Sequence, residues 1–411
     1  MKSKLHIGIT GYIGTDHVSE WLDGDTSLLP KGQPNAPLLG VLIGELLKQG
    51  HKVSAFTTDT TIFDENKIIK ASGKNFDFYI CPARPRAWRF NKFYLGRAVD
   101  GFAYERHQLL KAVKQAQPDI IHAHWTYEYA LAAIKTGLPH VITCHDSPKT
   151  ILRYSLGFYR FIHYLMARIV FKNGKNFSAV SPYMASSVQK YTPENIHIIP
   201  NPVANYVLKQ GYQRNNPLKK RIGLICNGWS DYKNPKPALI AFSNLTKIDP
   251  TAELHLFGFE FGINESAQKW CEKYNLNAGM HFHGITPHKQ LIEQLSKLDL
   301  LLHPALEESF SVVIAEAMTI GLPIVAGKYT GAIPWVVGAN LNTNQECCTV
   351  LTDVTNPDEI LTAILTAFDH KYSERSFAGY TRSKEMFNPV KICKTYTSLY
   401  RDILNTYQPN F

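Results

Sequence analysis

Two carboxylates eight positions apart, Glu308 and Glu316, lie between two short apolar runs of strand length, 298–303 and 322–326. The segment 310–320 between the runs has the apolar spacing of a helix. This pattern places Glu308 in the loop after a strand and Glu316 about two turns further on, inside the helix. Ligands of open parallel sheets bind outside the carboxyl ends of the strands. The pair therefore predicts a ligand site at that edge.

The residues that follow Glu308 are Ser309, Phe310 and Ser311. We expect their backbone N–H groups to lie at the helix start and to point toward an anion. One carboxylate at a phosphate-binding turn and another deeper in the same helix suit a ligand that carries both phosphates and hydroxyls. A sugar nucleotide is such a ligand.

The segment 304–326, with Glu308-x7-Glu316 at its centre, resembles the signature of retaining GT-B glycosyltransferases of the family 4 type. The resemblance continues outside it. Gly50-His51-Lys52-Val53 is similar to a family motif after the first helix, and Pro200-Asn201-Pro202-Val203 is similar to the family's interdomain turn. The alternation of strand and helix patterns along the chain independently favours parallel sheets with helices on both faces.

The resemblance implies an α/β fold of the GT-B type, in which two doubly wound Rossmann-like domains face each other across a cleft. We expect an N-terminal acceptor-binding domain over 1–205 and a nucleotide-sugar-binding domain over 206–388. A C-terminal helix in 389–411 is expected to return to the first domain, as it commonly does in this family.

The resemblance also implies roles for single residues. Glu316 is expected to accept hydrogen bonds from the ribose hydroxyls, and Glu308 to hold the hydroxyls of the transferred sugar. Lys233 follows a predicted strand end, and by resemblance it stabilises the donor diphosphate. His145 ends another predicted strand and is expected to contact the donor sugar, with Asp146 orienting the ring or contacting the acceptor. His122 and His124 are expected to be packing or loop residues.

Several positions depart from the family pattern. Trp229 stands where the family usually has an arginine beside the diphosphate, and Trp335 stands where it has a glutamate. Cations that could replace the arginine are Arg84, Arg86 and Arg153. The long segment 11–37 is interpreted as an acceptor loop, in which Gly14 is a candidate contact to the donor phosphate.

Length and composition fit a two-domain globular protein, since the chain has 411 residues and a hydrophobic content of 45%. No apolar run approaches the roughly 18 residues of a membrane span. The start of the chain lacks the pattern of a secretion signal. The 7 cysteines show no Cys-x-x-Cys pair. We therefore expect reduced thiols in a cytoplasmic protein and no zinc site.

The net charge of +10 is concentrated in the first half. Residues 1–205 contain 24 Lys/Arg and 15 Asp/Glu, a balance of +9. The segments 88–94 and 153–164 mix these cations with aromatic residues. Such stretches suit peripheral contact with an anionic membrane or a lipid-diphosphate substrate. The alternative, a solvated face of a core helix, stays open. No nucleic-acid recognition motif appears, so a nucleic-acid partner is not expected.

The leading hypothesis is a cytoplasmic or peripheral, metal-independent, retaining glycosyltransferase without a cofactor. Its donor would be a UDP- or GDP-sugar, and its acceptor a glycan or lipid-linked precursor of cell-surface polysaccharide or glycolipid. One alternative is a non-catalytic GT-B partner or scaffold protein in which Trp229 and Trp335 have eroded donor binding. Another is a sugar-nucleotide epimerase or phosphorylase on the same fold.

Overall fold

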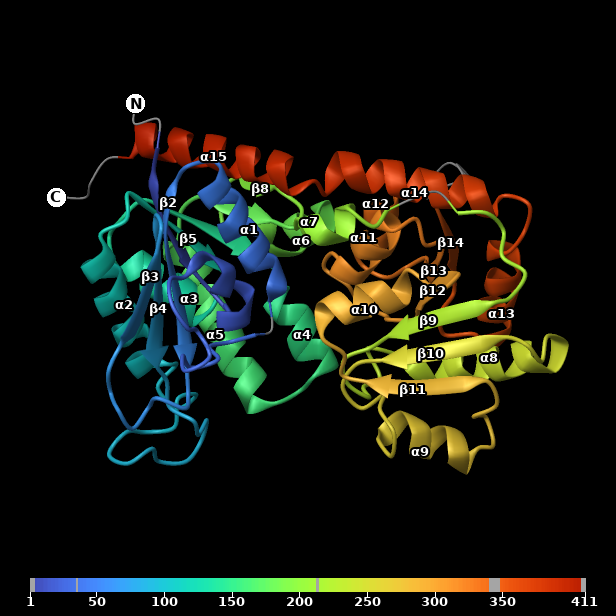
Figure 1. Ribbon diagram of the computed structural model, residues 1–411. Helices are drawn as coiled ribbons and strands as arrows, with labels where there is room; N and C mark the ends of the chain where they lie inside the picture. Colours follow the sequence, from blue (N-terminus) through green and yellow to red (C-terminus); the bar gives the residue numbers. More distant parts are fainter. Residues whose placement is uncertain (1–3, 35, 212–213, 340–347, 408–411) are drawn as a thin grey trace. The chain divides into compact units, whose positions relative to one another are not determined.

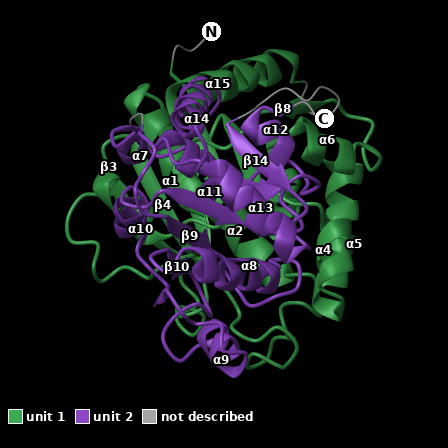
Figure 2. Cartoon of the chain, turned by 90° about the vertical axis from the view of Figure 1, so that its right-hand side faces the viewer, with its two compact units in different colours: residues 1–202, 389–411 green, residues 203–388 purple. Residues whose placement is uncertain are grey.

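A computed structural model describes residues 4–34, 36–211, 214–339 and 348–407. The chain forms two compact units, coloured separately in Figure 2. Unit 1 contains residues 1–202 and 389–411, and unit 2 contains residues 203–388. Each unit is built around one sheet with helices packed on it (Figure 1). The predicted α/β class with two doubly wound parallel sheets is confirmed.

Unit 1 has an eight-stranded sheet in the order β3-β4-β2-β1-β5-β6-β7-β8. Its strands are β1 His6–Thr10, β2 Lys52–Asp59, β3 Ile69–Gly73, β4 Phe76–Pro82, β5 Ile120–His124, β6 His140–Cys144, β7 Phe177–Ala179 and β8 Ile196–Ile198. Its α-helices are α1 Pro37–Lys48, α2 Ala103–Ala116, α3 Glu128–Lys135, α4 Pro148–Tyr154, α5 Phe158–Asn173, α6 Pro182–Gln189 and α15 Pro389–Thr406. The central strands are buried along nearly their whole length because helices cover both faces of a parallel sheet.

Unit 2 has a six-stranded, fully parallel sheet in the order β11-β10-β9-β12-β13-β14. Its strands are β9 Arg221–Ile225, β10 Glu253–Phe257, β11 Met280–Gly284, β12 Leu300–His303, β13 Ile324–Gly327 and β14 Thr349–Thr352. Its helices are α7 Asn205–Leu208, α8 Pro235–Ile248, α9 Ser266–Lys273, α10 His288–Leu295, α11 Val312–Thr319, α12 Ile333–Val337, α13 Pro357–Ala367 and α14 Tyr372–Met386.

Each sheet contains a point at which successive connections turn to opposite sides. In unit 2 this switch lies between β9 and β12, and in unit 1 it lies between β1 and β5. Crevices at such switch points, outside the carboxyl ends of the strands, are where open α/β sheets bind ligands. The topology therefore selects the loops after β9 and β12 in unit 2, and those after β1 and β5 in unit 1.

Two details differ from the sequence-based expectations. The edge strand β3 pairs antiparallel with β4, and the alternation of half-buried and exposed side chains along it hides it from a search for buried runs. The segment 11–37, expected as one long loop, contains two 3-10 helices, η1 Thr15–His17 and η2 Ser19–Trp21. They pack on α1, where Gly40 and Gly44 leave room for His17 and Trp21.

Helix α15 completes the core of unit 1. It packs on α1 (Figure 1) and contributes Ile392, Tyr396, Tyr400 and Ile403 to the same hydrophobic cluster. Two tyrosine hydroxyls also reach the sheet. Tyr400 hydrogen-bonds to Nδ1 of His122 at 2.7 Å, and Tyr396 lies 3.3 Å from the hydroxyl of Thr143. The last helix therefore anchors itself to unit 1 by apolar burial and by buried hydrogen bonds.

Candidate functional site

At the switch point of unit 2, the loop after β9 brings Lys233 to Glu308, which follows β12. Nζ of Lys233 donates to Oε1 of Glu308 at 2.8 Å, and both side chains are largely buried. The ring of His303, the last residue of β12, places Nε2 3.4 Å from the same carboxylate oxygen. The structure thus brings together two of the predicted site residues and adds a histidine that the sequence analysis did not select.

The electrostatics of this pair fix its charge state. Burial alone would raise the pKa of Glu308, but the Lys233 ammonium and the His303 ring outweigh burial and lower the pKa to about 2. Burial likewise depresses the pKa of Lys233, and the Glu308 carboxylate more than offsets it, so that pKa lies above its ordinary value. At neutral pH the site holds a carboxylate and an ammonium in contact.

The loop that carries Glu308 is shaped by a close backbone approach. A Cβ at Gly331, where φ is +45°, would stand 2.2 Å from the carbonyl oxygen of Glu308. The same carbonyl accepts a hydrogen bond from the N–H of Ala332 at 2.8 Å. Only glycine fits at position 331, so the start of α12 holds the Glu308 loop in place.

Glu316 is buried in the middle of α11, and it does not stand alone. Nε2 of His288, the first residue of α10, lies 2.8 Å from Oε1 of Glu316. Nδ1 of the same ring is hydrogen-bonded to the hydroxyl of Tyr206 in α7. Burial lowers the pKa of His288, but the hydrogen bond and charge of Glu316 outweigh burial and raise it above its ordinary value. Tyr206 and His288 orient the Glu316 carboxylate.

The start of α11 differs from the prediction. The helix begins at Val312, after Ser311 at φ +68°, so Ser309, Phe310 and Ser311 precede it. The N–H groups of the first turn therefore belong to Val312 and the residues after it. Phe310 is buried, and its ring packs edge-on against that of Phe387 at 5.2 Å.

Trp229 lies in an aromatic cluster of unit 2. Its ring centroid is 5.8 Å from that of Phe261 and 5.7 Å from that of Trp270, and its backbone N–H donates to Glu260 at 2.6 Å. Nζ of Lys236 lies 6.0 Å from the Trp229 ring. The position that the family fills with arginine is here half-buried and apolar.

Arg84 is not available to replace that arginine. Its side chain is fully buried in unit 1, where Nη2 contacts Glu105 at 2.6 Å and Nη1 contacts Asp100 at 2.7 Å. The expectation for Arg84 was therefore wrong, because two carboxylates already satisfy its guanidinium. Arg86 donates to the carbonyl of Phe90, and Arg153 is exposed.

At the carboxyl edge of the unit 1 sheet, His145 follows β6, the strand beside β5. It is hydrogen-bonded through Nε2 to Nδ1 of His124, the last residue of β5, at 2.8 Å. The ring of Trp125 lies 4.4 Å from the His145 ring. Burial lowers the pKa of His145 to about 3, so the ring is neutral at physiological pH. Asp146 accepts instead from the hydroxyl of Tyr127 at 2.9 Å. His124, expected to be a packing residue, orients His145, and the expected role of Asp146 in orienting the ring was wrong.

Local packing explains why position 14 is a glycine. A Cβ there would stand 2.5 Å from the Asp16 carboxylate and 2.9 Å from the backbone of Pro34. The N–H of Gly14 lies 3.4 Å from Nδ1 of His17, to which it donates. The contact of Gly14 with the donor phosphate stays a prediction.

The sequence analysis missed Glu128, which lies beyond β5 at the same edge of unit 1. Burial raises the pKa of Glu128 to about 7. The Tyr12 hydroxyl donates to its Oε1 at 3.3 Å, while Oε2 is buried without a hydrogen-bond partner among the described residues. A buried acid that titrates near neutrality at a switch point is a candidate functional group. The signal in the sequence was its position four residues after a strand end.

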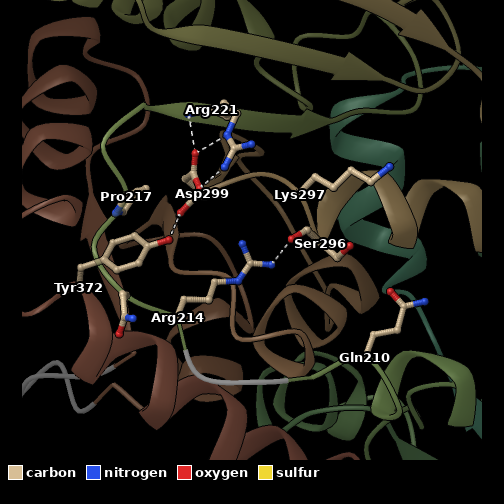
Figure 3. Close-up of a pocket in the computed structure, with 9 residues that line it drawn as sticks. Gln210, Arg214, Pro217, Arg221, Ser296, Lys297, Asp299 and Tyr372 are labelled. Atoms are coloured by element: carbon tan, nitrogen blue, oxygen red, sulfur yellow. Dashed lines mark hydrogen bonds and ion pairs between the residues drawn. The ribbon is translucent and has the colours of Figure 1, made fainter.

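A pocket with a volume of ≈ 680 Å³ lies at the opposite edge of the unit 2 sheet, before β9 and β12. Figure 3 shows the residues that line it. The pocket's two arginines are already paired with other groups of unit 2. Arg221 contacts Asp299 at 2.8 Å, and Arg214 donates to the carbonyl of Ser296 at 2.8 Å. Tyr372 donates to the backbone carbonyl of Asp299. This pocket lies between the segment 214–221 and the start of α14, and Glu308 is not among the residues that line it.

Comparisons with known proteins identify the family of the chain. Residues 39–204 match the family model described as Glycosyltransferase Family 4, and residues 211–384 match the model described as Glycosyl transferases group 1. The fold and the two family models together define the class, and the chain belongs to the GT-B glycosyltransferases of the family 4 type.

Among curated relatives, the lipopolysaccharide glucosyltransferase WaaG of Escherichia coli is 24% identical over 200 residues, which is 45% of this chain and 53% of WaaG. The chain thus spans about half the length of that relative. The uncharacterized glycosyltransferase YqgM of Bacillus subtilis is 22% identical over 348 residues, covering 83% of this chain and 92% of YqgM.

Among solved structures, sucrose-phosphate synthase from Thermosynechococcus elongatus has a TM-score of 0.73 at 18% identity, covering 98% of this chain and 100% of that one. The Anabaena protein HepE in complex with UDP-glucose has a TM-score of 0.66 at 15% identity, covering 97% of this chain and 100% of that one. These likenesses establish the fold. Within the described residues, no helix is both long and apolar enough to cross a lipid bilayer.

Proposed function

We propose that this protein is a retaining glycosyltransferase that moves a sugar from a UDP- or GDP-linked donor to a glycan or lipid-linked acceptor. The main support for the proposal is the ion pair between Lys233 and Glu308 at the switch point of unit 2. Glu316 lies in α11, the helix that follows. A cation, a helix start and two carboxylates at one strand edge match the phosphates and hydroxyls of a sugar nucleotide.

The reaction breaks the bond between the anomeric carbon and the diphosphate oxygen, and the electron pair leaves with the diphosphate. The acceptor hydroxyl oxygen bonds to the same face of that carbon, and its proton passes to the departing diphosphate. Lys233 would stabilise the growing negative charge, since preorganised donors act most strongly where charge develops. The first-turn amides of α11 would add to it. This donor set is what supports a metal-independent step.

The two carboxylates would hold hydroxyl groups. Glu316, fixed by His288 at 2.8 Å, would accept hydrogen bonds from the ribose. Glu308 would hold the transferred sugar once Lys233 turns from it to the diphosphate. In unit 1 we keep His145 as the proposed contact to the reacting sugar. Because its ring is neutral, it would act as a hydrogen-bonding group and not as a cation.

The first test is a thermal-shift panel of nucleotides followed by transfer assays with a labelled UDP- or GDP-sugar. We expect UDP or GDP to raise the melting temperature and label to move onto an acceptor. No shift with either nucleotide at millimolar levels would favour the non-catalytic scaffold. Label that stays on the nucleotide sugar or appears as sugar phosphate would favour an epimerase or a phosphorylase.

The site assignment is tested with Glu316→Ala, which should lower turnover at least tenfold in a folded protein because the ribose loses its acceptor. Glu359→Ala on α13 is the matched control, since Glu359 is exposed and lies outside the site. Equal turnover in Glu316→Ala and wild type would overturn the assignment.

We also propose that unit 1 makes peripheral contact with an anionic membrane. The supporting observation is a group of exposed apolar side chains in the segments 88–94 and 153–164, which include Phe93 at 99% exposure and Leu156 at 85%. The rings of Trp88 and Phe158, 5.4 Å apart, join the two segments into one surface. Arg89, Lys92 and Arg153 lie among them and are exposed. Apolar side chains that enter a bilayer beside cations that bind its phosphates are typical of interfacial proteins.

Buried free cysteines are consistent with the proposed cytoplasmic location.

A further inference from the structure

We propose that unit 2 contains a binding site for a divalent transition metal such as Zn²⁺. Its ligands are Glu253 and His255 on β10 and His281 on the neighbouring edge strand β11. The site is separate from the proposed reaction centre. Strand β11 is the edge of the sheet, and β12, which leads to Glu308, lies three strands further in (Figure 1).

The register of the sheet brings the three side chains together. His255 pairs directly with His281 across the parallel strands β10 and β11, and their rings lie 4.7 Å apart. Glu253 precedes His255 by two positions, so it lies on the same face of the sheet. One ligand atom from each residue can be chosen so that all three lie within 4.8 Å of one another.

An unsatisfied nitrogen marks the centre of this group. Nε2 of His255 is buried without a hydrogen-bond partner among the described residues, and it lies 3.5 Å from a carboxylate oxygen of Glu253. Tetrahedral zinc holds nitrogen and oxygen ligands at about 2.0–2.2 Å, which places neighbouring ligand atoms about 3.3–3.5 Å apart. The observed separation is that of two ligands of one metal ion. His281 is exposed and its ring stacks on that of His255, so metal binding would turn this ring toward the other two ligands.

A fourth side chain orients the central ligand. Nε2 of His283 is hydrogen-bonded to Nδ1 of His255 at 3.0 Å, and the His283 ring stacks on Phe257 at 4.6 Å. Metal-binding histidines usually have their second ring nitrogen held in this way, which fixes the ring and its tautomer. His283 therefore acts as the positioning residue of the site.

The ligand set selects the class of metal. Two imidazoles and one carboxylate suit zinc and its neighbours, whereas calcium and magnesium prefer oxygen ligands only. Three protein ligands leave a fourth position for water. A bound ion would tie the edge strand β11 to β10.

The test is calorimetric titration of the full chain with ZnCl₂ after chelator treatment and dialysis. We expect one ion to bind per chain and the melting temperature to rise with zinc. Glu253→Gln and His281→Gln should each weaken binding at least tenfold. His107→Gln and His197→Gln are matched controls, because both histidines are exposed in unit 1, and they should bind zinc as the wild type does.

Cobalt provides a second readout, since Co²⁺ in a four-coordinate site has intense visible absorption bands that should be absent from His281→Gln. The proposal is overturned if the wild type binds no zinc at micromolar concentrations. It is equally overturned if Glu253→Gln and His281→Gln retain wild-type affinity, because the ion would then bind elsewhere.

Discussion

Lys233 neutralises the charge of Glu308 in the free protein. The same side chain is the proposed contact to the donor diphosphate. Both interactions depend on the same ammonium, 2.8 Å from the carboxylate. Diphosphate binding must therefore compete with Glu308 for Lys233. The exchange would free Glu308 at the moment when a sugar arrives beside it.

Removing this ammonium should destabilise the fold as well as the reaction. We expect Lys233→Met to lower the free energy of unfolding by about 1–3 kcal/mol at pH 7, because Glu308 becomes a largely buried charge without its partner. Adding Glu308→Gln should recover most of the loss. Urea unfolding of the two single variants and the double variant measures this coupling. Additive losses would show that the pair does not interact as described.

Glu128 makes a separate prediction about pH. Its folded pKa of about 7 exceeds the ordinary value of 4.5, so the folded state binds more protons between these values. The contribution of Glu128 to stability is therefore complete below pH 4.5 and is lost as the pH rises through 7.

Glu128→Gln should consequently be more stable than wild type at pH 8, by at most about 3–4 kcal/mol, and the difference should vanish near pH 4.5. Urea unfolding at the two pH values gives the measurement. Glu359→Gln, at an exposed position, should show no such difference. A Glu128→Gln variant whose stability parallels that of the wild type at every pH would contradict the raised pKa.

At the residue scale, the sequence was sufficient to place a residue where its location follows from its position after a strand. Glu308 and Lys233 could be placed at one sheet edge because parallel strands share an edge. The contacts to Glu316 could not be predicted, because His288 and Tyr206 come from helices distant in sequence. The three histidines and Glu253 were missed for a similar reason, since only the register of β10 on β11 brings them together.

Among the elements, α15 allows a direct test of how unit 1 is held together. Tyr400→Phe should lower the free energy of unfolding by about 1–3 kcal/mol, because Nδ1 of the buried His122 loses its partner. Lys394→Ala on the exposed face of α15 is the control and should change little. Hydrogen exchange of β5 and β6 measures the effect within unit 1. Unchanged exchange in Tyr400→Phe would argue against the anchoring role.

Also at the scale of elements, whether a strand could be predicted from the sequence depended on how deeply it is buried. The buried strands around the two switch points are rich in apolar residues and were found. The half-buried edge strand β3 has no such run. The start of α11 was expected two residues early, since apolar spacing cannot show that Ser311 adopts a left-handed conformation.

At the scale of the whole molecule, the uneven distribution of charge predicts binding to anionic lipid vesicles. We expect sedimentation with anionic vesicles, little with zwitterionic ones, and release as salt rises, since screening shortens to about 3 Å at 1 M. Phe93→Ser combined with Phe158→Ser should reduce binding to anionic vesicles severalfold. Phe259→Ser, which removes an exposed ring of unit 2, is the control. Equal binding by all three proteins would contradict the proposed contact.

The return of α15 to unit 1 has a consequence for biosynthesis. A ribosome releases residues 203–388 before 389–406, so unit 2 is complete while unit 1 still lacks its last helix. At about 5–20 residues per second this delay lasts roughly 10–40 s. During that time the apolar side chains of α1 that α15 will cover are open to water and to chaperones. The first unit to emerge is thus the last to be finished.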